Sequence, residues 1–60
     1  MLHKRLIALR KKKKLTQNEL AQKLGITRSA LSQYELGNRH PDYETLQKIA
    51  EFFDCSTDYL

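Results

Sequence analysis

The sequence predicts an all-α fold, a compact five-helix bundle that forms a single domain over residues 1–60. Apolar residues recur at helical spacing along most of the chain, and two glycines and one proline leave little room for structure other than helices and tight turns. The segment Gln17–Leu36 has the pattern of two short helices joined by a tight turn. Sixty residues is close to the smallest size at which a core holds a domain together unaided, so one domain is expected.

The first helix is expected at about residues 2–13. Leu2, Leu6 and Leu9 follow the i, i+4, i+7 spacing of a buried helical face, and Leu15 continues the burial after the helix ends. The helix finishes in a basic run, residues 10–14, for which two interpretations stay open. The run is either a solvated helix end whose cations suit the helix dipole or part of a surface that binds a polyanion.

The second helix should begin after Thr16, which forms a T-x-x-E capping box with Glu19. Leu20 and Leu24 lie one turn apart and make the inner face of this helix. Ala21 falls where the second and third helices should cross most closely, because a larger side chain would push them apart.

A tight turn should connect the second helix to the third. Gly25 stands where the chain needs a positive φ, Ile26 fills the turn, and Thr27 is a natural N-cap for a helix at about residues 28–36. Apolar, small and turn residues in this register, together with the two caps, are typical of a helix-turn-helix. Such a unit places its second helix in the DNA major groove.

The third helix has an apolar arc and a polar arc when its residues are set about 100° apart. The apolar arc holds Ala30, Leu31 and Tyr34, and the polar arc holds Arg28, Ser29, Ser32 and Gln33. Arginine pairs with guanine, glutamine pairs with adenine, and serine binds either a base or a phosphate. An ordinary solvated face more often carries Glu–Lys pairs, so the polar arc indicates contact with DNA bases.

The last two helices are expected at residues 43–53 and 57–60. Asp42 is the N-cap of the first of them, and Ser56 caps the second. The apolar period of the first is given by Tyr43, Leu46, Ile49, Ala50 and Phe53. Because the chain ends inside the last helix, we expect it to be the N-terminal part of a longer protein.

Basic residues are concentrated in the first two thirds of the chain. Residues 1–40 carry ten of the eleven Lys and Arg and two of the seven acids, which gives this segment a net charge of +8. Residues 41–60 carry one base and five acids, which gives a net charge of −4. One side of the folded domain should therefore be strongly positive, which favours a polyanion as partner. No apolar run approaches the length of a membrane span, and the first helix lacks the broad apolar stripe that binding to a membrane surface needs.

The sequence offers no candidate site for catalysis, a metal or a cofactor. His3 and His40 are far apart and have no cysteine partner at zinc spacing, and Ser29 and Ser32 lack the context of a nucleophile elbow. The single cysteine has no partner for an internal disulfide, which fits a reducing cytoplasm. The chain is therefore not expected to be an enzyme.

Five stretches of the chain resemble the Cro and phage-repressor type of helix-turn-helix domain, the XRE-like group of bacterial and phage transcription regulators. They are L-x-x-L-R at residues 6–10, L-T-Q-x-E-L-A-x-K-L-G-I at 15–26, S-x-x-E-x-G-x-R-x-P at 32–41, L-x-K-I-A-x-x-F at 46–53 and S-x-D-x-L at 56–60. The resemblance implies a lambda-repressor-like bundle of five helices whose third helix contacts bases. It also implies that pairs of domains bind palindromic operators.

The resemblance implies three sets of site residues. Those expected to contact DNA bases are Thr27, Arg28, Ser29 and Gln33. Those expected to contact phosphates are Gln17, Asn18, Asn38 and Arg39, with Lys11 and Lys13 added from the basic run. Arg10 and Glu35 match a family pair that ties the first helix to the end of the third, so a largely buried salt bridge is expected between them.

Four positions depart from the family pattern. One is Cys55, which replaces a usual valine and behaves well as a small buried hydrophobe. Lys14 and Asp54 stand where the family usually has glycine after a helix, so the turn at Lys14 should be strained or differently shaped. Aspartate tolerates the left-handed conformation moderately. Leu36 lies on the outer arc of the third helix, where the family is usually polar.

Three functions are weighed. The first is a sequence-specific DNA-binding regulator, a cytoplasmic and nucleoid-associated repressor that binds a palindromic operator as a weak, DNA-assisted homodimer. The second is a protein-interaction module such as an antitoxin or adaptor, which would use exposed apolar residues among Ile7, Leu36, Phe52 and Tyr59. The third is RNA binding, for which the chain lacks an aromatic stacking platform.

Overall fold

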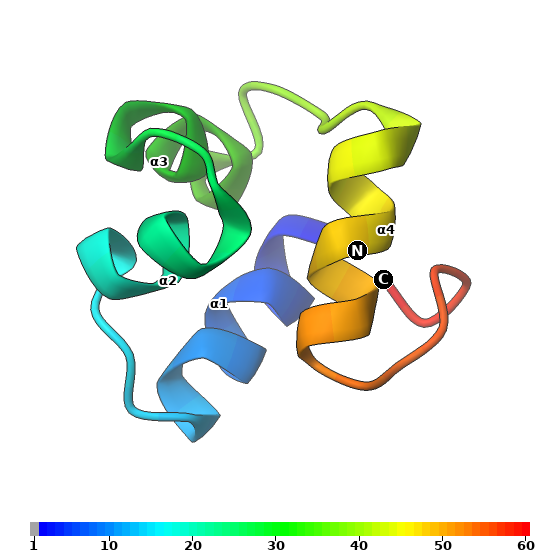
Figure 1. Cartoon of the computed structure of the whole chain (residues 1–60). Coiled ribbons are helices and arrows are strands. Elements are labelled where there is room, and N and C mark those ends of the chain that lie inside the picture. The colour runs from blue at the N-terminus through cyan, green and yellow to red at the C-terminus, as the bar shows by residue number, and fades with distance from the viewer. Residues whose placement is uncertain (1) are drawn as a thin grey trace.

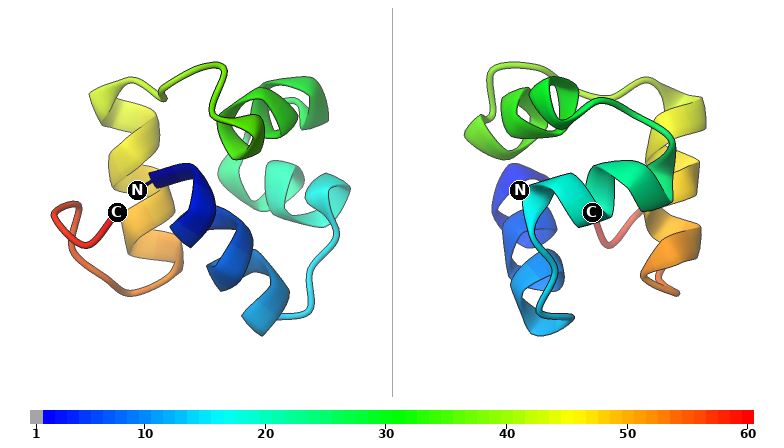
Figure 2. Two further views of the ribbon diagram at one scale, coloured as in Figure 1. Left: turned by 180° about the vertical axis from the view of Figure 1, so that it is seen from behind. Right: turned by 60° about the vertical axis from the view of Figure 1, so that its left-hand side comes forward.

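Four helices make up the described part of the chain, residues 2–60, in the computed structural model (Figure 1). They are α1 (Leu2–Lys12), α2 (Gln17–Leu24), α3 (Arg28–Leu36) and α4 (Tyr43–Phe52). Helices α2 and α3 lie together on one side of the molecule, and α4 stands on the other side (Figures 1 and 2). Each helix agrees with its expected position to within one residue at either end, and the all-α class is confirmed.

The fifth helix expected at residues 57–60 is absent, and this prediction is wrong. Residues 57–59 form a turn, in which the amide of Tyr59 donates to both the carbonyl and the hydroxyl oxygen of Ser56 at 3.2 Å. Ser56 therefore caps the segment as expected. Residues 57–60 offer a single amide that can reach a carbonyl four residues back, and one such bond does not offset the cost of nucleating a helix.

Three of the helices begin at the caps that the sequence indicates. Thr16 and Glu19 form both bonds of the capping box, at 3.1 and 2.8 Å. Thr27 and Asp42 each accept a hydrogen bond from the amide three residues later, at 3.0 and 2.9 Å. Hydrogen bonding from Thr16 lowers the pKa of Glu19, and hydrogen bonding from Thr45 lowers the pKa of Asp42, because both favour the ionised carboxylate.

All four helices end in the same way. After each helix one residue adopts a left-handed conformation, and the next amide donates to a carbonyl five residues back, as in a Schellman motif. The left-handed residues are Lys14 (φ 57°), Gly25 (φ 70°), Gly37 (φ 79°) and Asp54 (φ 54°). The closing bonds run from Leu15 to Arg10, from Ile26 to Ala21, from Asn38 to Gln33 and from Cys55 to Ala50, at 2.9 to 3.1 Å. The turn at Lys14 thus keeps the shape of the glycine turns, but in a conformation that costs a residue with a side chain roughly 1–2 kcal/mol.

The core lies where all four helices converge. Its fully buried side chains are Leu6, Leu20, Leu31 and Ile49, one from each helix. Tyr43 was expected on the buried face of α4 but is 68% exposed, so that prediction is wrong. At about 100° per residue, Tyr43 lies roughly 70° away from the mean direction of the other apolar residues of α4. None of the helices of residues 2–60 has the length and apolar character needed to cross a membrane.

Candidate nucleic-acid interface

The inner face of α3 fixes this helix on the rest of the domain. Leu31, Tyr34 and Glu35 are its buried residues. In α2, which packs against it, Ala21 is 2% exposed, and its carbonyl accepts the amide of Ile26 at 3.0 Å to close the turn. The small side chain expected at the helix crossing is therefore buried in the core cluster.

The outer face of α3 carries the residues that were expected to contact bases. Thr27, Arg28 and Ser29 are exposed at its start, and Gln33 is half-buried one turn further on. The hydroxyl oxygen of Thr27 accepts the amide of Ala30, so its own hydrogen remains free to donate. These side chains supply both donors and acceptors on one face of a helix, as base edges in a major groove require.

A three-residue cluster anchors the carboxyl end of α3. The buried carboxylate of Glu35 accepts hydrogen bonds from Arg10 Nε at 2.7 Å, from Arg10 Nη2 at 3.1 Å and from Gln17 Nε2 at 2.9 Å. Arg10 Nη1 also donates to the carbonyl of Leu15 at 2.9 Å. The expected salt bridge between Arg10 and Glu35 is present, and it joins α1, the start of α2 and the end of α3.

Gln17 is a member of this cluster that sequence reasoning missed. The resemblance implied a contact with phosphate for Gln17, and no local pattern links residues 18 positions apart. One hydrogen of its side-chain amide is bonded to Glu35, while the second hydrogen and the backbone N–H at the start of α2 have no partner within the helix. Gln17 thus ties α2 to α3 and still presents donors at the helix start.

The segment after α3 folds back against that helix through two side chains. Asn38 Nδ2 donates to Gln33 Oε1 at 3.2 Å, and the guanidinium of Arg39 lies 5.6 Å from the centroid of the Tyr34 ring. Both Asn38 and Arg39 are exposed. Asn38, expected to contact a phosphate, is therefore held next to Gln33, expected to contact a base, while Arg39 lies beside Tyr34.

The lysines of the basic run lie apart from this face. Lys11, in the last turn of α1, and Lys13, just after this helix, are exposed, and α1 runs away from α3 toward this end (Figures 1 and 2). The ammonium of Lys13 lies 5.5 Å from the centroid of the Phe52 ring, at the end of α4. Phosphate contacts from these lysines would have to be made at the margin of an interface centred on α3.

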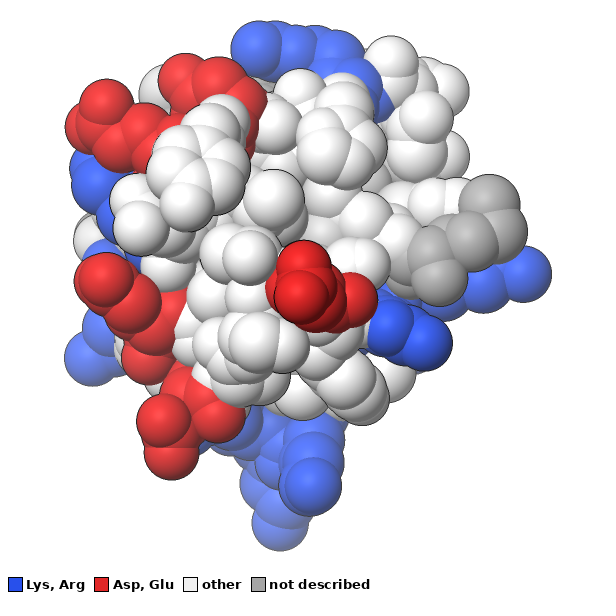
Figure 3. All heavy atoms as spheres, turned by 90° about the vertical axis from the view of Figure 1, so that its right-hand side faces the viewer, with Lys and Arg blue, Asp and Glu red and all other residues white. Residues whose placement is uncertain are grey.

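The acidic residues gather on the side of the molecule that bears α4. Figure 3 shows this side, with carboxylates spread over it and Lys and Arg mostly at its edges. Glu44, Glu51, Asp54 and Asp58 are exposed in α4 and after it. A polyanion should therefore approach from the side of α2 and α3 and be repelled from the side of α4.

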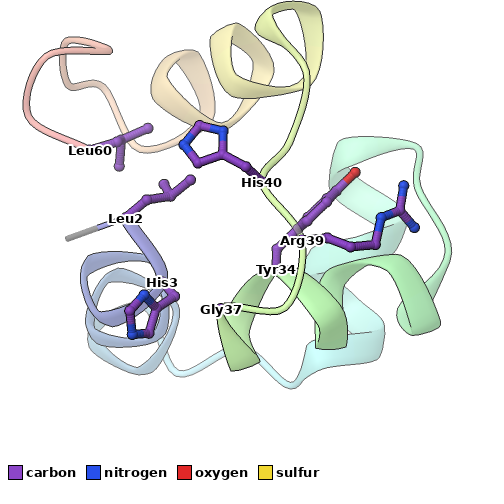
Figure 4. A pocket seen from close by; sticks show the side chains of 7 residues that line it. All are labelled: Leu2, His3, Tyr34, Gly37, Arg39, His40 and Leu60. Carbon is purple, nitrogen blue, oxygen red and sulfur yellow. The ribbon is translucent and has the colours of Figure 1, made fainter.

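A hollow of about 330 Å³ lies behind the segment that follows α3. It is lined by Leu2, His3, Tyr34, Gly37, Arg39, His40 and Leu60 (Figure 4). A Cβ added at Gly37 would lie 3.3 Å from Cγ of the His3 ring, which is a tight contact. Among residues 2–60, no three His, Cys, Asp or Glu side chains gather in a group that could hold a metal ion.

A family profile described as Helix-turn-helix matches residues 6–60 of the chain. The chain belongs to the helix-turn-helix family. Its relatives include the HTH-type transcriptional regulators YqaE and ImmR of Bacillus subtilis (strain 168). YqaE is 55% identical to this chain over 60 residues, which are 100% of this chain and 52% of YqaE. ImmR is 48% identical over 59 residues, which are 98% of this chain and 46% of ImmR. The chain therefore spans about half the length of these two relatives.

A solved helix-turn-helix structure is also similar to the chain. The crystal structure of the P22 c2 repressor, in complex with synthetic operator 9T in the presence of Tl⁺, has a TM-score of 0.93 and 34% sequence identity. The match covers 98% of this chain and 89% of the repressor chain. The resemblance to phage repressors that the sequence motifs indicate is thereby confirmed.

Proposed function

We propose that this helix-turn-helix domain binds double-stranded DNA in a sequence-specific way, as the DNA-binding part of a cytoplasmic transcription regulator and most simply of a repressor. The observation that carries the proposal is the outer face of α3. Arg28, Ser29 and Gln33 stand there together, on a helix whose other face is buried and whose end is fixed by Glu35. Relatives described as transcription regulators and a similar repressor solved with its operator support it.

In this proposal α3 enters the major groove. Thr27, Arg28, Ser29 and Gln33 contact base edges, while Gln17, Asn18, Asn38 and Arg39 contact the phosphates on either side. Lys11 and Lys13 contribute at the margin through their charge. A dyad-related pair of domains then occupies two half-sites about 34 Å apart, one helical turn, on one face of the duplex.

The alternative function, a protein-interaction module, would use exposed apolar side chains. Leu36 is 63% exposed and Tyr59 is 48% exposed, whereas Ile7 and Phe52 are half-buried. In the present proposal the same exposed residues make the weak contact between the two domains on DNA.

Selection from a pool of random duplexes tests the proposal. The domain should enrich a sequence with two inverted half-sites spaced by one helical turn. A pool that stays random after several rounds, while the protein remains folded, would contradict it. Competition with the same sequence as single-stranded RNA provides the control for non-specific binding to a polyanion.

A further inference from the structure

The side chain of Gln33 is not free on the surface of α3. Its Oε1 accepts a hydrogen bond from Nδ2 of Asn38 at 3.2 Å. The backbone of Asn38 is attached to the same residue, because its amide donates to the Gln33 carbonyl at 3.1 Å. The amide of Arg39 donates to that carbonyl as well, at 3.3 Å. The position of Asn38 relative to Gln33 is thus fixed by the turn that ends α3.

We propose that Asn38 is a positioning residue that sets which end of the Gln33 amide faces the DNA bases. The proposal rests on the proposed function, in which α3 contacts base edges. A glutamine amide has an acceptor end, Oε1, and a donor end, Nε2, of nearly equal shape. The Nδ2 group of Asn38 donates and cannot accept, so it holds Oε1 and leaves Nε2 directed away from the turn.

This orientation determines the base preference of Gln33. With Nε2 presented, Gln33 favours base edges that accept a hydrogen bond, namely N7 of a purine or O4 of thymine, over the N4 donor of cytosine. Because DNA displaces water from the pair, the bond between Asn38 and Gln33 should strengthen on binding. Asn38 would therefore affect specificity without contacting a base.

Two variants of Asn38 separate this role from a phosphate contact. Asn38→Ala removes the donor, and Asn38→Asp replaces it with a group that only accepts, which should turn the Gln33 amide so that Oε1 is presented. Asn18→Ala and Asn18→Asp are the matched controls, because Asn18 is an exposed asparagine at the start of α2 and the same charge is added there.

The experiment first finds the position in the duplex at which Gln33→Ala abolishes the protein's preference for one base pair. It then uses four duplexes that differ only at that position. We expect Asn38→Ala to reduce the preference for the acceptor base by about 2- to 10-fold, the effect of one hydrogen bond. Asn38→Asp should shift the preference toward cytosine. The Asn18 variants should weaken binding to all four duplexes alike, and melting temperatures should show that every variant is folded.

Three results distinguish failure of this inference from failure of the proposed function. If the native protein shows a preference that Gln33→Ala removes, but both Asn38 variants keep it, Asn38 does not position Gln33. The inference is also overturned if Asn38→Asp retains the native preference, because the amide would then already present Oε1. If the native protein shows no preference at any base pair of a selected duplex, the proposed function itself fails.

Discussion

Arg10 and Glu35, which are 25 residues apart in the chain, form a bidentate ion pair with N–O distances of 2.7 and 3.1 Å. The side chain of Glu35 is 4% exposed and that of Arg10 is 14% exposed. A pair this deeply buried is not necessarily more stable than an apolar replacement, but it is intolerant of losing one partner. Since Gln17 bonds to the same carboxylate, the pair determines how the end of α3 sits against the start of α2.

The first prediction is that Arg10→Met lowers the free energy of unfolding by about 3–5 kcal/mol, because Glu35 is left as a buried charge with Gln17 as its remaining partner. Denaturant unfolding measures the loss. Lys11→Met, an exposed change on the same helix, should stay within about 0.5 kcal/mol of the native protein. The double variant Arg10→Met/Glu35→Met should be more stable than Arg10→Met alone. If the double variant is less stable, the loss does not arise from an unpaired carboxylate.

The second prediction concerns the turn after α1. Lys14 has a φ of 57°, a conformation that glycine adopts without steric cost. Lys14→Gly should therefore remove the left-handed penalty, but it also adds backbone entropy to the unfolded chain. The net effect should be a rise of about 0.5–1 kcal/mol in the free energy of unfolding. Ala8→Gly, in the exposed middle of α1, should lower it by about 1 kcal/mol. Thermal unfolding of both variants and of the native protein measures the two changes in stability. Loss of stability in both would show that Lys14 carries no strain.

The third prediction compares the two glycines that have positive φ. A Cβ at Gly25 would meet nothing within 4 Å, whereas a Cβ at Gly37 would lie 3.3 Å from the ring of His3. Gly25→Ala should therefore cost only the left-handed penalty, about 1–2 kcal/mol, and Gly37→Ala should cost more.

The His3→Ala background provides the control for the steric part of that difference. In it, Gly37→Ala and Gly25→Ala should cost the same within the error of denaturant unfolding. A difference that persists without the imidazole would assign the extra cost to another neighbour.

The fourth prediction concerns phosphate contacts. Arg39→Ala should lower the slope of log K against log salt concentration by about one unit, because Arg39 is exposed in the segment that follows α3 and can reach a phosphate beside that helix. Lys13→Ala should lower it less, since the Lys13 ammonium lies over Phe52. Lys48→Ala, on α4, is the control and should leave the slope unchanged. Equal effects of all three changes would show that binding depends on net charge alone.

The sequence predicts the parts of this fold that have local causes. Thr16, Thr27 and Asp42 act as caps, and Gly25 turns the chain, because each of these roles depends on residues within four positions. Of the two outcomes expected at Lys14, strain or a different shape, the structure shows the first, because the hydrogen bonds that close the turn hold the lysine in the left-handed conformation.

The remaining features depend on contacts between distant residues or on the end of an element. The bond between Gln17 and Glu35 requires α2 and α3 to be packed, and the exposure of Tyr43 follows from its angle at the start of α4. The bond between Asn38 and Gln33 forms only after Gly37 turns the chain. No spacing rule signals the two hydrogen bonds, whereas the helical angle of Tyr43 could have indicated its exposure.

The measurement that tests the central claim most directly compares a selected duplex with a shuffled duplex of the same composition, at one salt concentration. Fluorescence anisotropy gives the affinity of the native domain, Gln33→Ala and Arg28→Ala for each. We expect each substitution to cost roughly 1–3 kcal/mol on the selected duplex and little on the shuffled one, because base-edge contacts are lost only where they are made. If both substitutions weaken binding to the two duplexes equally, α3 does not contact bases, and the interaction-module function becomes the better account.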